Sequence, residues 1–479
     1  MSLMGPLAIR LSGQTTPAKS LVMPRYSEYK ASGVEWLGEV PEHWAVKPIK
    51  AVSTCNDAVL EESTLPDYEI EYIEISGVDA SRGISETTVI PFGNAPSRAR
   101  RRVADGDVLV STVRTYLRAI APVTNPPTNM IASTGFAVIR PRHIEPSFLG
   151  FMFQAEFLIA EIIARSVGVS YPAINASDLM RLDIPIPTRE EQQTIAAFLD
   201  RETGKIDTLI AEQRRLVELL AEKRQAVISH AVTKGLPSTS SGLNVTMKDS
   251  GIEWLGEVPW HWEVKRLRFV AELNPSKSEV ATLDKETLVS FLPMDAIGDD
   301  GRLNLEREKP ISEVETGYTF FRDGDVTVAK ITPCFENGKG AVMRGLTQGI
   351  GFGTTELIVA RPIASQVSSD YLHNLFTSVV FRKNGEGHMY GAGGQKRVPD
   401  DFVRDFEIAF PPLKEQQTIA SFLDSEIAKF DTLSTEANRA IELLQERRSA
   451  LISAAVTGKI DVRCNTFESG AHDAVATLS

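Results

Sequence analysis

Two long segments of the chain carry apolar residues at helical spacing and contain no proline. In the first segment, the a and d positions of a heptad template hold eight residues, of which five are apolar: Ile206, Leu209, Gln213, Leu216, Leu220, Lys223, Val227 and His230. In the second segment the same positions hold Phe430, Leu433, Ala437, Ala440, Leu444, Arg447, Leu451 and Ala454. The pattern predicts two helices of about 33 residues each. Gly204 precedes the first, and Thr188, Glu190 and Glu191 suit the start of a short helix before it.

The two segments belong to a duplication of the whole chain. Residues 32–47 read SGVEWLGEVPEHWAVK and residues 250–265 read SGIEWLGEVPWHWEVK, an offset of 218. The offset is still 218 from Asp107 to Asp325, but it is 224 from EQQTIAAFLD at Glu191 to EQQTIASFLD at Glu415. The second copy has therefore gained six residues inside its globular part. A period above 200 residues is too long for a solenoid, so we interpret it as duplication of a domain followed by a helix.

This order predicts an α+β protein. It consists of two tandem-duplicated α/β domains separated by two long, coiled-coil-like helices, which the near-twofold arrangement of the copies makes antiparallel. The expected boundaries are 24–187 and 247–411 for the domains, 188–235 and 412–460 for the helical regions, 236–246 for a linker and 461–479 for a C-terminal tail.

The apolar helix positions predict either pairing between the helices or binding of a partner. The residues concerned are Ile206, Leu209, Leu216, Leu220, Phe430, Leu433, Leu444 and Leu451. The small Ala437 and Ala440 would complement Leu209 and Leu216 in a close pair. The alternative is that each helix packs on its own domain as an amphipathic cover.

Composition narrows the functional classes. The 479 residues are 42% hydrophobic, which suits several folded modules, and the net charge of −12 argues against indiscriminate coating of nucleic acid. No stretch approaches a membrane span or a signal peptide, so we expect a cytoplasmic protein. Cys55, Cys334 and Cys464 are widely spaced, which favours reduced thiols without a metal.

Searches for catalytic motifs find little. Residues 125–128, Asn-Pro-Pro-Thr, are similar to a motif of adenine methyltransferases, but Thr128 cannot stack on a base, which favours a proline-rich loop. Residues 338–340 lack the spacing and hydroxyl of a phosphate-binding loop. The repeated His43 and His261, and the tryptophans of the EWLGEVPxHW motif, are interpreted as packed core residues and not as ligands or base-stacking groups.

Basic clusters lie deeper in each domain. The DNA-binding candidates of the first copy are Arg98, Arg100, Arg101, Arg102, Arg114 and Arg118, the last two beyond an expected strand at 108–113. Those of the second copy are Lys330, Lys339, Gln395, Lys396 and Arg397, with Arg344, Arg382 and Lys383 nearby in sequence. Arginine suits phosphates and guanine edges, and Gln395 suits adenine. A solvated basic surface is the alternative for each cluster.

The paired EWLGEVPxHW openings, the paired EQQTIAxFLD segments and the paired AVT helix ends together resemble the specificity subunit of type I restriction-modification systems. The resemblance spans nearly the whole chain, except for the tails before Met23 and after Val462. It implies a non-catalytic subunit whose two domains each read half of a bipartite site in double-stranded DNA. The helices would space these domains and bind two modification subunits. Restriction subunits would join through the complex, and S-adenosylmethionine, ATP and Mg would bind to the partner subunits.

Little sequence is shared between the copies within the domains, so we expect unlike half-sites and an asymmetric target. Two other classes stay open at this point. One is a duplicated protein-interaction scaffold that never touches DNA, and the other is a stand-alone DNA methyltransferase.

Overall fold

The structure, a computed structural model, describes residues 24–79, 83–236, 246–392 and 394–463. It divides into two compact units, Met1–Glu212 with Ala440–Ser479 and Gln213–Arg439. Each unit therefore combines one globular domain with parts of both long helices. Nearly all of the expected linker, most of the C-terminal tail with Cys464, and the N-terminal tail lie outside the described residues.

The first unit is built on two four-stranded sheets. One sheet has the order β11-β10-β13-β4 and is antiparallel, and the other has the order β8-β5-β12-β9, in which β5 and β12 are parallel. The strands of the first sheet are β4 (Ser53–Cys55), β10 (Val108–Ser111), β11 (Ile120–Pro122) and β13 (Phe136–Pro141). Those of the second are β5 (Glu69–Ile73), β8 (Thr88–Pro91), β9 (Ala99–Arg102) and β12 (Met130–Ser133).

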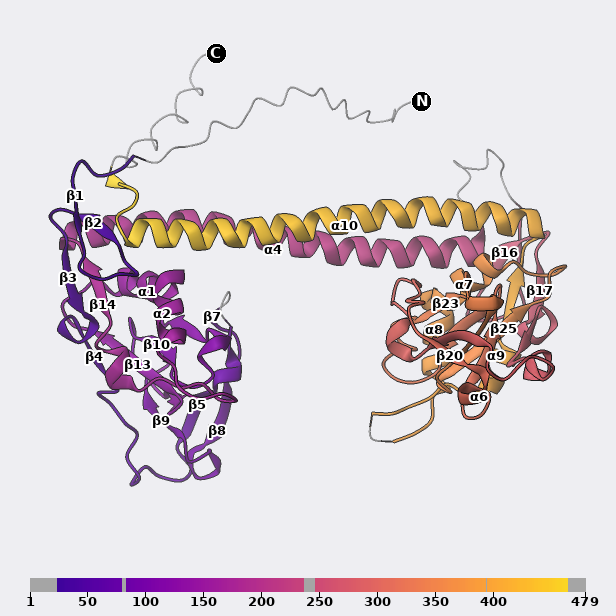
Figure 1. The fold of residues 1–479 in the computed structure, drawn as a ribbon, viewed down its shortest axis with the longest axis horizontal. Helices are drawn as coiled ribbons and strands as arrows, with labels where there is room; N and C mark the ends of the chain where they lie inside the picture. Colours follow the sequence, from indigo (N-terminus) through magenta and orange to yellow (C-terminus); the bar gives the residue numbers. More distant parts are fainter. Residues whose placement is uncertain (1–23, 80–82, 237–245, 393, 464–479) are drawn as a thin grey trace, which may run out of the picture. The chain divides into compact units, whose positions relative to one another are not determined.

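Short strand pairs and helices complete this unit (Figure 1). The paired strands are β1 (Tyr29–Ala31) with β2 (Glu39–Pro41), β3 (Ala45–Pro48) with β14 (Asp183–Ile186), and β6 (Val78–Asp79) with β7 (Gly83–Ile84). The helices before α4 are α1 (Pro146–Gln154), α2 (Glu156–Ala164) and α3 (Ala176–Leu179).

Strand β10 lies between two apolar layers. Val108 and Val110 pack in the same cluster as Phe148 of α1, whereas Leu109 packs in a cluster with Ala132 of the other sheet. Burial on both faces accounts for the uninterrupted apolar run at this strand, because a strand with one solvated face alternates instead.

The second unit repeats this architecture. Its sheets have the orders β18-β25-β22-β23 and β20-β19-β24-β21, and β19 and β24 are again parallel. The strands are β18 (Ala271–Leu273), β19 (Leu288–Leu292), β20 (Glu308–Pro310), β21 (Thr319–Arg322), β22 (Val326–Ala329), β23 (Gly340–Val342), β24 (Ile350–Gly353) and β25 (Leu357–Pro362). Two strand pairs complete the unit, β15 (Met247–Asp249) with β16 (Glu257–Pro259) and β17 (Glu263–Arg266) with β26 (Glu407–Phe410). Its short α-helices are α6 (Ile311–Val314), α7 (Ser369–Thr377), α8 (Val379–Glu386) and α9 (Asp400–Asp405).

The long helices α4 (Arg189–Lys234) and α10 (Leu413–Val456) are longer than predicted, at 46 and 44 residues. The expected break at Gly204 is wrong, because the short and long helices form one continuous α4. At its start, the Glu191 amide donates to Thr188 Oγ1 at 3.3 Å, and the Thr188 amide donates to Glu191 Oε2 at 3.2 Å. This capping box fixes where α4 begins.

Within each unit the segments of α4 and α10 lie side by side and run antiparallel (Figure 1). In the first unit Arg448 Nε lies 2.9 Å from Asp207 Oδ1, and in the second Arg224 Nη1 lies 3.9 Å from Asp431 Oδ1. These are the same pair, since 224 residues separate Asp207 from Asp431 and Arg224 from Arg448. The predicted antiparallel pairing is thus present in both units.

The heptad register is half correct. Ile206, Leu220 and Phe430 are buried as predicted, and Leu444 and Leu451 are half-buried. We call the row of residues along each long helix that faces the other long helix the seam. At every second seam position this residue is the one after the residue that the heptad template predicts. Leu209, Leu216 and Leu433 are 45%, 41% and 46% exposed, whereas Ile210 is buried. After Ile206 the next buried position is therefore four residues on, at Ile210, whereas the heptad template predicted it three residues on, at Leu209.

Each globular domain is bonded to the start of its own long helix. Glu191 is buried, and its Oε1 accepts from His43 Nε2 at 2.9 Å and Trp44 Nε1 at 3.5 Å. In the second unit Glu415 accepts from His261 and Trp262 at 2.6 and 3.0 Å. Trp44 and Trp262 are fully buried, as predicted for core residues, but Trp254 is 40% exposed and the His43 side chain 44% exposed, so the prediction of core packing is wrong for these two.

Glu191→Gln should lower the free energy of unfolding of the first unit by about 1.5 to 3 kcal/mol, the range for hydrogen bonds to a charged group. Burial acts to raise the pKa of Glu191, but the bonds from His43, Thr188 and Trp44 outweigh it and hold the pKa below its usual 4.5. A lowered folded-state pKa stabilises the fold above pH 4.5, and this contribution is lost as the pH falls through the folded-state value.

Denaturant melts at several pH values check this prediction, with the exposed neighbour Glu190→Gln as the matched control. The gap between wild type and Glu191→Gln should be widest at neutral pH and should close in acid. A gap that is independent of pH would show that the carboxylate charge has no part in the anchor.

The ends of the helices complete the core of each unit. Ile452, Ala455 and Val456 of α10 belong to the main apolar cluster of the first unit, and so does Val462 beyond the helix. The Asp461 amide donates to Pro24 O at 2.7 Å. Residues 461 and 462 therefore still pack on the first domain, and the expected start of a tail at 461 is too early.

Candidate nucleic-acid interface

A buried ion pair holds the start of the central strand in each domain. Asp107 precedes β10 and is fully buried, and its carboxylate receives Arg140 Nε and Nη2 at 2.8 and 2.6 Å. In the second unit Asp325 and Arg361 form the same fork at 2.8 and 2.9 Å. These residues are the repeated Asp-Gly-Asp-Val and Arg-Pro segments of the sequence, so their repetition marks a structural contact.

A small hairpin, residues 167–173, lies at the other end of β10. Val167 and Ala173 exchange backbone hydrogen bonds of 2.8 and 3.0 Å. The hairpin is bonded to the chain after β10, because the Arg114 amide donates to Pro172 O and the Ile174 amide to Thr112 O. We call it the first hairpin.

The second unit has the equivalent hairpin at residues 390–392 and 394–397, the second hairpin; residue 393 lies outside the described residues. Tyr390 and Arg397 exchange backbone hydrogen bonds of 3.1 and 2.9 Å, and the Thr332 amide donates to Lys396 O. Gly168 and Gly391, which follow the first strand residue of each hairpin, both have positive φ, at 117° and 124°. One backbone frame therefore presents two different tips, and Gln395 and Lys396 are exposed on the second.

The arginines predicted in the first copy do not form one free cluster. Arg98 is paired with Glu74 at 2.6 Å, and Arg118 with Glu156 at 2.7 Å. The guanidinium of Arg100 lies over the ring of Phe92, and Arg101 is half-buried. Within the described ranges, Arg102 and Arg114 are exposed and form no ion pair, which leaves both available to phosphate or base.

The candidates of the second copy divide in the same way. Lys339 is mostly buried, 3.6 Å from Asp299, and the guanidinium of Arg397 is held by Glu356 at 2.8 Å. Lys330 is half-buried near the same glutamate. Of the residues that the structure describes here, Gln395 and Lys396 are exposed and their side chains form no hydrogen bond.

Sequence reasoning missed an apolar group beside the first hairpin. Val169 is fully exposed, Val167 and Tyr171 are 80% and 64% exposed, and Tyr116 and Leu117 after β10 are about half exposed. The guanidinium of Arg114 lies 4.8 Å from the centre of the Tyr171 ring. The alternation of Val167, Val169 and Tyr171 by itself predicts only a strand. The sequence signal that could have identified them as a candidate site is that they align with the basic loop of the second copy.

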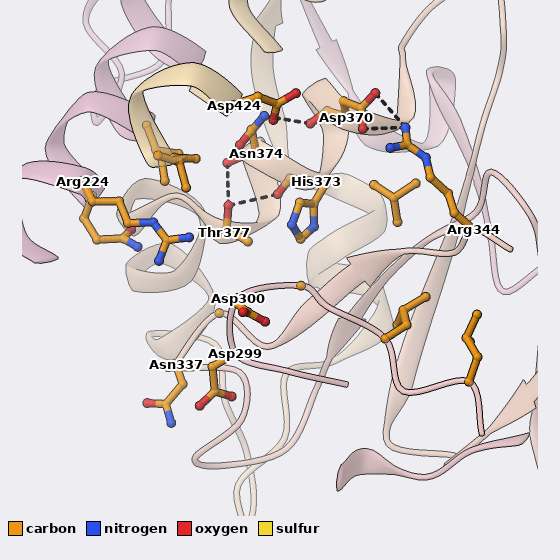
Figure 2. Close-up of a pocket in the computed structure, with 18 residues that line it drawn as sticks. Arg224, Asp299, Asp300, Asn337, Arg344, Asp370, His373, Asn374, Thr377 and Asp424 are labelled. Carbon is orange, nitrogen blue, oxygen red and sulfur yellow. Dashed lines mark hydrogen bonds and ion pairs between the residues drawn. The ribbon is translucent and has the colours of Figure 1, made fainter. Parts of the chain in front are cut away.

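The second unit also contains a cavity of about 480 Å³, lined in part by residues of α4, α7 and α10 (Figure 2). Its charged lining consists of Arg224, Arg344, Asp299, Asp300, Asp370 and Asp424. Burial and the two arginines, opposed by Asp370, lower the pKa of His373 to about 4, so this imidazole is neutral at pH 7. Four carboxylates against two guanidinium groups make a poor phosphate site, and the cavity therefore gives no support for a nucleotide site.

The described residues contain neither a candidate metal site nor a single helix that could span a membrane. No group of three or more His, Cys, Asp or Glu side chains there is placed to hold a metal ion. No single described helix is long and apolar enough to cross a membrane; the bent pair α1 and α2 passes by length and composition only.

The comparison with known families decides the classification. The profile described as type I restriction modification DNA specificity domain matches residues 41–219 and 261–443, one match for each copy of the duplication. The chain belongs to this family. The fold, the duplication and the resemblance noted in the sequence agree with that membership.

Individual relatives align in two ways. The Escherichia coli EcoAI specificity subunit is 41% identical over 198 residues, which is 41% of this chain and 33% of the relative. The Escherichia coli K12 EcoKI specificity subunit is 21% identical over 437 residues, which is 88% of this chain and 90% of the relative. The chain thus matches about a third of the length of its EcoAI relative.

A solved structure shares the fold of this chain. That structure comes from work on complex assembly and conformational transition of the type I R-M system. Its sequence is 23% identical to this chain, and the TM-score between the two is 0.63. The similarity covers 88% of this chain and 99% of that one. At this identity the likeness concerns the fold alone.

Proposed function

We propose that this specificity subunit is a non-catalytic, sequence-specific DNA-binding protein whose two domains each read half of an asymmetric bipartite site. The observation that carries the proposal is the pair of hairpins. The same backbone frame stands at the end of the central strand in both units, with apolar side chains in one and Gln395 and Lys396 in the other. Two unlike surfaces on one frame suit two unlike half-sites in double-stranded DNA.

The long helices are proposed to bind two modification subunits, to which restriction subunits add in the cytoplasmic complex. Support comes from leucines that lie outside the seam. Leu209 and Leu433 are equivalent in the two helices, and so are Leu219 and Leu443, and all four are 44% to 53% exposed. Exposed leucines in equivalent places offer two similar apolar surfaces to two copies of one partner. S-adenosylmethionine, ATP and Mg are assigned to those partners.

Co-purification with a modification subunit tests the proposal. The complex should methylate DNA at a defined sequence, whereas the isolated chain should neither methylate nor cut DNA when S-adenosylmethionine or ATP is supplied. Methyl transfer by the isolated chain would favour a stand-alone methyltransferase. A stable complex that binds all DNA sequences equally would favour the interaction scaffold.

Gln395→Ala should weaken binding of the complex to its cognate duplex by about 1 to 3 kcal/mol and relax selectivity at one base pair of one half-site. Titration of duplexes altered separately in each half measures this, and Gln417→Ala, an exposed glutamine on α10, is the control. An equal loss of affinity on every DNA sequence would show that Gln395 contacts the DNA backbone and does not read a base.

A further inference from the structure

The first hairpin has an unusual surface for a soluble protein. Val167 is exposed at its base and Val169 and Tyr171 toward its tip, and Tyr116 and Leu117 are exposed on the segment bonded to it. Exposed apolar side chains on two segments that are bonded to each other mark a contact site more often than they mark an accident of packing.

The support beneath this tip is well bonded. Arg118 forms two hydrogen bonds of 2.7 Å with Glu156 of α2, and Thr115 Oγ1 lies 2.7 Å from Ser166 Oγ. Arg114 and Arg118 both adopt positive φ, at 51° and 55°, a conformation that costs energy for a side chain larger than glycine. The apolar tip is therefore held outward by its surroundings.

The equivalent position in the second unit suggests the occupant. There the frame carries Gln395 and Lys396, side chains suited to base edges and phosphates. In the first unit the guanidinium of Arg114 lies over Tyr171 at the tip, and the described part of the chain holds no carboxylate partner of Arg114. A positive group beside an apolar tip complements the major groove, which admits a two-stranded ribbon and exposes thymine methyl groups between phosphates.

We propose that the first hairpin reads its half-site through apolar contacts of Val169 and Tyr171 with thymine 5-methyl groups in the major groove. The inference rests on the proposed DNA-binding function. It makes the two domains chemically different readers. One recognises methyl groups, and the other recognises hydrogen-bonding edges and phosphates.

Deoxyuridine lacks the 5-methyl group and otherwise pairs as thymidine does. The experiment measures the affinity of the complex with modification subunits for its mapped duplex, with thymidines replaced by deoxyuridine in one half or in the other. Loss of one buried methyl contact should weaken binding about fourfold. We expect this weakening in one half-site only.

Val169→Thr keeps the shape of the side chain and replaces a methyl by a hydroxyl. It should bind the natural site more weakly and should distinguish thymidine from deoxyuridine less well in that half, because only the methyl contact of Tyr171 remains. Val89→Thr, an exposed valine on β8, should behave as wild type. Tyr171→Phe should retain the discrimination, and Tyr171→Ser should reduce it.

Several results would overturn the inference. The first is an affinity that deoxyuridine changes in neither half, and the second is unchanged discrimination between thymidine and deoxyuridine in Val169→Thr. The third is a site in which one half contains no thymine and deoxyuridine in the other half does not change the affinity. A variant that loses modification subunits but keeps its base selectivity would assign the hairpin to a protein contact. In each of these cases sequence-specific binding persists, whereas binding without any sequence preference would instead refute the proposed function.

Discussion

Asp107→Ala should destabilise the first unit by about 3 to 5 kcal/mol, the cost of leaving one member of a buried ion pair without its partner. Asp107 is fully buried and bonds Arg140 through both oxygens, and it also accepts the Ala104 amide at 2.8 Å. The alanine variant would leave the guanidinium of Arg140 and the amide of Ala104 without these partners.

Hydrogen exchange followed peptide by peptide measures this in the assembled chain, where a single unfolding transition need not describe two units. Exchange should rise in β10 and β13 and stay unchanged in β22 and β25. Asp325→Ala should give the opposite distribution, and the exposed Asp67→Ala should change neither. Unchanged protection of β10 in Asp107→Ala would contradict the structural role of the pair.

The second large effect concerns a fragment of residues 1–236, which should form a dimer that recognises an inverted repeat of the first half-site. In the whole chain the first unit receives Ile452, Ala455 and Val456 from the end of α10. The fragment lacks them, but the end of α4 carries Ile228, Ala231 and Val232 at the equivalent positions. Each copy can thus supply the other with the same three side chains through a twofold contact.

Polar contacts favour the same exchange. Ser453 Oγ accepts the Glu156 amide at 3.2 Å, and its equivalent Ser229 accepts the Val379 amide at the same distance in the second unit. One contact opposes it. Ala437 is buried, and the fragment has the larger Gln213 in its place, so the dimer should be weaker than the native pairing.

Sedimentation of the fragment and methylation mapping with modification subunits check this prediction. Residues 1–212, which lack the apolar end of α4, serve as a control and should stay monomeric. A stable monomer of 1–236 that binds one half-site tightly would show that each helix packs on its own domain.

The helices and the duplication were predictable from sequence because both leave a local or repeated pattern. The register of the seam was not predictable, because at the positions where the two possible registers differ the sequence has two adjacent apolar residues. Leu209 with Ile210 and Leu216 with Val217 satisfy either register, and only the partner helix selects between them. The buried ion pair and the Glu191 anchor left a signal in the repeated motifs, but their partners are distant in sequence.

The candidate site was predicted less well than the fold. Arginine type and clustering are visible in the sequence, but pairing with Glu74 or Glu156 depends on tertiary contacts between distant segments. Exposure of Val169 and Tyr171 is likewise a tertiary property, since an alternating apolar pattern ordinarily indicates one buried face. The second hairpin was found because glycines and polar residues adjoin there, and the first was overlooked because its residues resemble core.

Genome-wide mapping of methylated bases in cells that contain the full chain and its modification subunits tests the central claim most directly. Two unlike domains that each read one half-site predict a single asymmetric motif, made of two different short sequences separated by a fixed number of unspecified bases. A continuous motif, a palindromic one, or methylation without any motif would contradict the account.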